Sequence, residues 1–149
     1  MKLTSSEFSN DQEIPKKYGY NFENINPPLE IEQVPENTKS LVLLMDDPDA
    51  LAAVGKVWVH WIIWNISPET KFVPENFICN HELEGKNDFG EIGYGGPAPP
   101  DKKHTYIFQL FALSKKLDNL EGSTKQDIEK SMESAIISKS VLKGTFTPK

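Results

Sequence analysis

A loop rich in glycine and proline runs from Gly93 to Pro100 and leads into an apolar segment that begins with His104 and Tyr106. Glycine lets backbone N–H groups approach a ligand closely, and proline fixes a loop without using donors. In a strand the side chains of His104 and Tyr106 would share one face, about 7 Å apart along the chain. This combination predicts a pocket for a small anion. The alternative is that Tyr106 is a core aromatic residue whose hydroxyl reaches water.

The carboxylates of Asp46-Asp47-Pro48-Asp49 end the first long apolar run. An Asp-Pro turn is the simplest interpretation of this cluster. His60, however, lies within an almost unbroken apolar run, and a buried imidazole needs hydrogen-bond partners. Because consecutive strands are usually neighbours, a carboxylate from the turn at 47–49 is an available partner for His60. That contact would raise the pKa of His60 and favour an imidazolium able to hold an anion.

Three apolar segments must position these side chains. Residues 39–46, 56–66 and 104–113 are each predicted to form a strand that is buried on both faces. Strict alternation predicts which side chains share a face. In the second segment one face would carry Trp58, His60, Ile62 and Trp64, and the other face Val57, Val59, Trp61 and Ile63. In the third segment one face would carry His104, Tyr106, Phe108 and Leu110, and the other face Ile107, Phe111 and Leu113.

One segment predicts a helix. It starts at the possible N-cap hydroxyls of Ser123 and Thr124, and its apolar stripe consists of Ile128, Met132, Ala135 and Ile136. A last strand is predicted from Val141 to Phe146, with a bulge at Gly144. Strands at these spacings with one clear helix favour an all-β sandwich, and the absence of a linker or repeat indicates a single domain over residues 1–149.

Composition narrows the function classes. The net charge is −6 and the chain has no arginine, which disfavours nucleic-acid binding and leaves lysine, histidine and backbone N–H groups as the donors for a phosphate. Cys79 is the only cysteine, so an intrachain disulfide and a cysteine-based metal cluster are excluded. The first residues lack the apolar core of a signal peptide, and no run reaches transmembrane length, so we expect a cytoplasmic protein.

Several motifs in order along the chain resemble the phosphatidylethanolamine-binding protein family, whose members include Raf kinase inhibitor proteins, in its compact prokaryotic form. The matching segments are Ile14–Tyr18, Asn24–Leu29, Asp46–Ala50, Trp58–Asn65, Asn87–Gly90, Gly93–Pro100, His104–Leu113 and Leu142–Phe146. The resemblance implies a mainly β fold, a β-sandwich with one C-terminal helix and short helical turns, and a small anion-binding cavity near one end. Carried over by position, the ligand-binding residues would be Asp47, His60, Gly96, Pro97, His104 and Tyr106, with Pro48, Asp49, Tyr94 and Gly95 in the pocket wall.

The same resemblance implies a binding protein without enzymatic activity, cofactor or metal. Its expected ligand carries phosphate or carboxylate, its expected protein partner is a kinase or a serine protease that it inhibits, and a homodimer is an additional expected assembly. Two alternatives stay open. One is a metal-dependent or acid–base hydrolase that uses His60, His104 and Asp47, because two histidines and a carboxylate form a known metal-binding set. The other is an interaction domain with an unused pocket.

Overall fold

The fold is built around one strand that is buried along its entire length. In the computed structural model, which describes residues 1–149, this strand is β4 (Ser40–Asp47). It pairs antiparallel with β5 (Trp58–Ile66) on one side and with β8 (His104–Leu113) on the other. β8 in turn pairs with β9 (Ile136–Phe146) along nearly its whole length. The three strands predicted from apolar runs are therefore the centre of the sheet.

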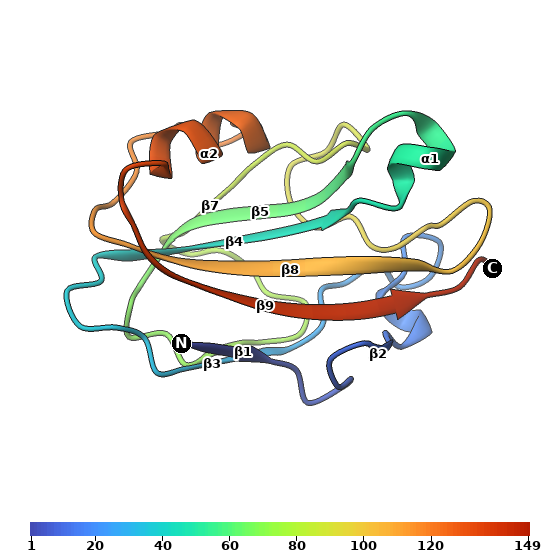
Figure 1. The fold of residues 1–149 in the computed structure, drawn as a ribbon, viewed down its shortest axis with the longest axis horizontal. Coiled ribbons are helices and arrows are strands. Elements are labelled where there is room, and N and C mark those ends of the chain that lie inside the picture. Colours follow the sequence, from blue (N-terminus) through green and yellow to red (C-terminus); the bar gives the residue numbers. More distant parts are fainter.

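Two sheets and one helix form the layers of the molecule (Figure 1). The large sheet has the order β2-β9-β8-β4-β5-β7, and the small sheet has the order β1-β3-β6. The small sheet covers one face of the large sheet, and helix α2 (Lys125–Met132) covers the opposite face. The remaining elements are β1 (Lys2–Thr4), β2 (Gln12–Glu13), the 3₁₀ turn η1 (Lys16–Tyr18), β3 (Leu29–Glu32), α1 (Ala50–Val54), β6 (Phe72–Val73) and β7 (Leu83–Glu84).

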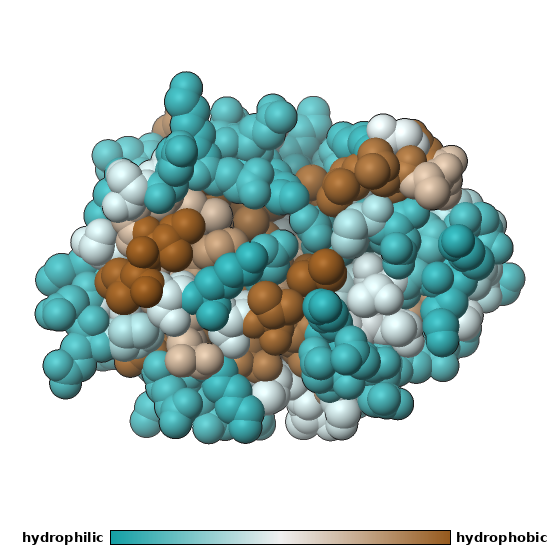
Figure 2. Space-filling view, in the orientation of Figure 1, coloured by the Kyte–Doolittle hydropathy of each residue, from teal (hydrophilic) through white to brown (hydrophobic).

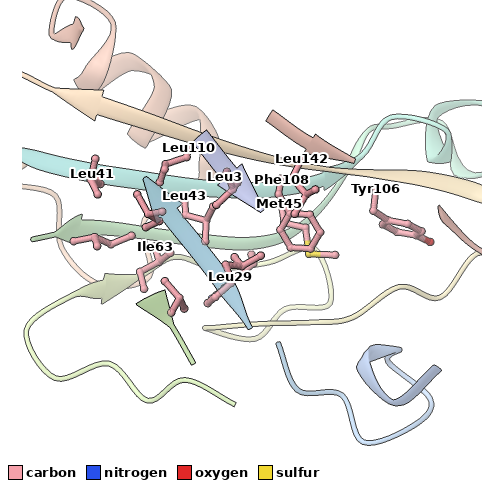
Figure 3. Packing of buried hydrophobic residues seen from close by; sticks show 14 of the residues in the cluster. Leu3, Leu29, Leu41, Leu43, Met45, Ile63, Tyr106, Phe108, Leu110 and Leu142 are labelled. Carbon is pink, nitrogen blue, oxygen red and sulfur yellow. The ribbon is translucent and has the colours of Figure 1, made fainter. Parts of the chain in front are cut away.

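Apolar side chains fill both spaces between the layers. The larger cluster lies between the two sheets, and the smaller one lies between the large sheet and α2. Alternation along β8 sorts its residues as predicted, with Tyr106, Phe108 and Leu110 in the larger cluster and Phe111 and Leu113 in the smaller. Figure 3 shows Tyr106 at one end of the larger cluster, beyond Phe108. The mainly β sandwich predicted from the sequence is confirmed.

The predicted faces of β5 are wrong at its first residues because the strand contains a β-bulge. Met45 pairs with Trp61, but the next residue of β4, Asp46, pairs with Val59, so His60 is an extra residue. A bulge shifts the alternation by one position. Val59 consequently packs with the cluster under α2, whereas Trp58 and His60 line a cavity together with Tyr106.

Two predictions near the C-terminus also need correction. The helix begins as expected, with a capping box between Thr124 and Asp127, but it ends at Met132. Ala135 is buried outside the helix, and Ile136 is half-exposed as the first residue of β9. Gly144 pairs regularly with Tyr106 instead of forming a bulge. A glycine is needed there because a Cβ atom would lie 2.5 Å from Cγ1 of Ile14. None of the helices has the length and apolar character that crossing a membrane requires.

Candidate ligand-binding site

A cavity of about 200 Å³ lies at the end of the large sheet where β4 ends and β5 and β8 begin. The antiparallel pairing of these three strands brings residues far apart in the sequence to the same end. Its lining residues are Asp47, Ala50, Val54, Trp58, His60, Phe89, Ala98, Pro100 and Tyr106. The wall is therefore mostly apolar with a few polar groups, which is typical of sites for small molecules.

Asp47 is held in place by a chain of hydrogen bonds that leads out to the surface. Nδ1 of the fully buried His104 lies 2.6 Å from one carboxylate oxygen of Asp47. Nε2 of the same ring lies 2.7 Å from a carboxylate oxygen of Asp101, whose side chain is exposed. Burial alone would lower the pKa of His104, but the bonds to both carboxylates outweigh it and raise that pKa. The two carboxylates thus favour the imidazolium form of His104, which can donate a hydrogen bond from each ring nitrogen.

His60 has a different partner from the one expected. The bulge directs the ring toward the loop that follows β7, where Nδ1 donates to the carbonyl of Gly95 at 2.6 Å. Burial lowers the pKa of His60 to about 4, so the imidazole is neutral near pH 7 and Nε2 is an acceptor. The predicted pairing of His60 with a carboxylate of the 47–49 turn is therefore wrong, because that carboxylate pairs with His104.

The loop beside His60 is fixed by hydrogen bonds within the protein. The N–H of Gly95 donates to the carbonyl of His60, and the N–H of Gly96 donates to Oδ1 of Asn24 at 2.8 Å. A Cβ atom on Gly96 would lie only 2.0 Å from the carbonyl oxygen of Tyr18. The glycines therefore let two stretches of backbone approach each other, and the N–H groups that were expected to face a ligand are already occupied.

A second loop supplies the aromatic cover of the cavity. Oδ1 of the buried Asn87 accepts hydrogen bonds from the N–H groups of Phe89 and Glu91, and its Nδ2 donates to the carbonyl of Gly93. The ring of Phe89 then meets the ring of His60 at 5.5 Å between centroids and the ring of Trp58 at 5.6 Å. Asn87 is thereby a positioning residue for the cavity wall.

Three buried polar atoms around the cavity have no hydrogen-bond partner in the protein. They are Oδ1 of Asp47, the hydroxyl of Tyr106 and Nε1 of Trp58, and all three side chains line the cavity. A buried polar group without a partner destabilises the folded state by about 1–3 kcal/mol. Three such groups at one cavity are what a binding site for a hydrogen-bonding ligand requires.

The rim of the cavity is apolar on one side. Helix α1 follows the Asp-Pro turn, and its residues Leu51 and Val54 expose more than half of their surface. Val54 also lines the cavity. Figure 2 shows the corresponding apolar surface where α1 lies in Figure 1. A ligand whose polar group lies in the cavity would therefore extend toward solvent along an apolar rim.

The structure brings only part of the predicted site to the cavity wall. Asp47, His60 and Tyr106 line the cavity, whereas His104 lies behind Asp47 and does not line it. Six of the predicted residues do not line the cavity. They are the predicted ligand-binding residues Gly96 and Pro97 and the predicted wall residues Pro48, Asp49, Tyr94 and Gly95. Asp49 accepts the N–H of Thr105, and Tyr94 donates to the carbonyl of Tyr18, so both have bonds within the protein.

Sequence reasoning missed Asp101, Trp58 and Phe89 as parts of the site. The spacing of Asp101 three residues before His104 was an available signal for their contact. Nothing in the sequence places Phe89 against His60, because a long-range loop contact determines it. The two carboxylates bind opposite nitrogens of His104, so they do not converge on one point, and no group of three or more His, Cys, Asp or Glu side chains is arranged to hold a metal ion.

Comparison with known proteins establishes the family. The family model for phosphatidylethanolamine-binding protein matches residues 4–147. The chain belongs to the phosphatidylethanolamine-binding protein family. A UPF0098 protein of Chlamydia trachomatis is 42% identical over 148 residues, covering 98% of both chains. A UPF0098 protein of Methanothermobacter thermautotrophicus is 39% identical over 151 residues, again covering 98% of both chains.

Solved structures of this family have the same fold. A homologue of phosphatidylethanolamine-binding protein from Chlamydia trachomatis superposes with a TM-score of 0.92 at 40% identity, covering 99% of this chain and 97% of its own. YbcL of Escherichia coli, a member of the same family, gives a TM-score of 0.91 at 26% identity, covering 99% and 98%. A carboxypeptidase Y inhibitor, solved with its cognate proteinase, shares the fold at a TM-score of 0.61 and 16% identity, covering 99% and 83%.

Proposed function

We propose that this member of the family is a non-enzymatic binding protein whose cavity holds a small ligand with a phosphate or carboxylate group. The observation that carries the proposal is the set of three unpartnered polar atoms on Asp47, Tyr106 and Trp58. The hydroxyl of Tyr106 and the N–H of Trp58 are donors for an anion, and His60 adds an acceptor. The apolar remainder of the wall excludes water and strengthens these bonds.

Calorimetric titration of the protein with methyl phosphate at pH 6 tests the proposal. Binding at one site per chain is expected. Trp58→Phe removes one donor to a charged group and should weaken binding by roughly 10- to 100-fold, since such a bond contributes about 1.5–3 kcal/mol. The matched control is Trp64→Phe, because Nε1 of Trp64 is also buried and unpartnered but belongs to the cluster under α2. Equal losses for both variants, or no binding by the unmodified protein, would contradict the proposal.

We further propose that the ligand-loaded protein regulates a protein partner, a kinase or a serine protease, as an inhibitor. The support is the family and the fold shared with the carboxypeptidase Y inhibitor. Inhibition assays against purified kinases and serine proteases, with and without methyl phosphate, measure this role. No inhibition of any enzyme in either condition would leave the ligand site standing without this role.

The competing function is an acid–base hydrolase that uses the same pocket. One observation favours it, namely the hydrogen-bonded chain from Asp47 through His104 to the exposed Asp101, which connects the cavity with solvent. Release of nitrophenolate from p-nitrophenyl phosphate separates the two functions. Turnover that is lost in His104→Gln would support the hydrolase, whereas binding without turnover supports the proposed binding function.

A further inference from the structure

The charges around the cavity are unusual for a site that takes an anion. No lysine is among the lining residues, and the chain has no arginine. Lys56 and Lys125 are paired with Asp88 and Asp46, and Lys102 and Lys103, which follow the lining residue Pro100 by two and three positions, are exposed and do not line the cavity. The one charged group on the wall is therefore Asp47, which is negative and nearly fully buried. A doubly charged phosphate placed here would meet a carboxylate oxygen without a partner.

The hydrogen-bonding pattern shows how that conflict is resolved. The wall offers two donors, the hydroxyl of Tyr106 and the N–H of Trp58, and two acceptors, Oδ1 of Asp47 and Nε2 of His60. A fully ionised phosphate has only acceptors and leaves the acceptors of the wall unsatisfied. A phosphate group that retains one proton supplies acceptors to the donors and a donor to Asp47.

We propose that the cavity binds a phosphate monoester with one proton shared between a phosphoryl oxygen and Oδ1 of Asp47, so that it selects the singly charged form of the ligand. This inference rests on the proposed ligand-binding function and specifies the ligand's chemical class. A phosphodiester has no such proton. A carboxylate ligand would need to bind in its protonated form, and because carboxyl pKa values lie near 4 it would bind only in acid solution.

The titratable groups around the shared proton come from several elements. His104 and Tyr106 face Asp47 from β8, Asp49 faces it from the turn after β4, and Asp101 lies behind His104. His60 faces the cavity from β5 and is neutral near pH 7. Burial raises the pKa of Asp47 although the bond from His104 opposes that shift, and this also favours a proton at the site.

The affinity for methyl phosphate between pH 6 and pH 8 tests the inference. Because the second pKa of a phosphate monoester is about 6, the singly charged form falls about 50-fold over this range, and the affinity should fall in proportion. At pH 8 calorimetry in two buffers of different ionisation enthalpy should report the uptake of about one proton for each ligand bound. Dimethyl phosphate at pH 6 should bind at least about tenfold more weakly than methyl phosphate, because it cannot donate to Asp47.

Asp47→Asn is the decisive variant, since its amide can donate to a fully ionised phosphate. Its affinity for methyl phosphate should vary by less than about threefold between pH 6 and pH 8 and should exceed that of the unmodified protein at pH 8. The inference would be overturned if the affinity of the unmodified protein for methyl phosphate stayed constant or rose between pH 6 and pH 8. It would also be overturned if binding at pH 8 took up no proton. Absence of binding at every pH would instead refute the proposed function itself. The measurements on the unmodified protein decide the question if the variant does not fold.

Discussion

Removing the hydroxyl of Tyr106 tests whether this group binds a ligand or stabilises the fold. Tyr106 is fully buried, its hydroxyl makes no hydrogen bond of good geometry within the protein, and burial together with the nearby carboxylate of Asp47 raises its pKa so that it stays protonated. An unsatisfied buried hydroxyl costs about 1–3 kcal/mol, and Tyr106→Phe removes it. The lost oxygen borders an existing cavity of about 200 Å³, so little packing is lost. The free energy of unfolding should therefore stay unchanged or rise by up to about 1 kcal/mol.

Urea unfolding followed by tryptophan fluorescence measures this effect, and a gain of 1 kcal/mol would raise the melting temperature by roughly 2–4 °C. Affinity for methyl phosphate should fall by at least about tenfold in the same variant. Tyr94→Phe is the matched control, because the hydroxyl of Tyr94 donates to the carbonyl of Tyr18 at 2.9 Å. Its removal should destabilise the protein by about 0.5–1.5 kcal/mol. Equal destabilisation in both variants would refute the view that Tyr106 reserves its hydroxyl for a ligand.

Two further predictions concern stability. The pKa of His104 is raised in the folded protein, so its contribution to stability is complete below its unfolded pKa of about 6.5 and is lost as pH rises through the folded value. The free energy of unfolding should thus decrease above pH 7 in the unmodified protein and decrease less in His104→Gln, and identical pH profiles from urea titrations would contradict this. Gly96→Ala should destabilise by about 1–3 kcal/mol or more, because the added Cβ meets the backbone carbonyl of Tyr18. The control Ala52→Gly, at an exposed position of α1, should cost about 1 kcal/mol in the same urea assay.

Local patterns in the sequence were sufficient to predict the central strands and the contents of most of the core. The continuous apolar runs of β4 and β8 left no other regular structure that could bury them, and alternation assigned the faces of β8 correctly. The predicted helix was too long because the same apolar spacing continues into the connection to β9. Ala135 is buried there without being helical.

The site was harder to predict because long-range geometry determines it. The types of the polar residues indicated a pocket, but the partner of each depended on the bulge at His60 and on loops that pack against it. Alternation alone assigns Trp58 and His60 to the face that α2 covers, and no glycine marks the irregularity. The contact between His104 and Asp101 is local and could have been predicted, whereas that between Asp47 and His104 joins two strands and depends on their register.

The extra residue in β5 divides one strand into two independent parts. Beyond His60, the apolar side chains of the strand belong to the packed interior, where substitutions are limited by volume; they are Trp61, Ile62, Ile63, Trp64 and Ile66. Before it, Trp58 faces a hollow whose shape can change without disturbing that interior. Ligand preference can therefore diverge among relatives through changes at the first residues of this strand while the scaffold stays the same. Deleting His60 would leave Val59 opposite Asp46 and Trp58 opposite Asp47 in a regular ladder, so the tryptophan would keep its face while the cavity would lose the imidazole.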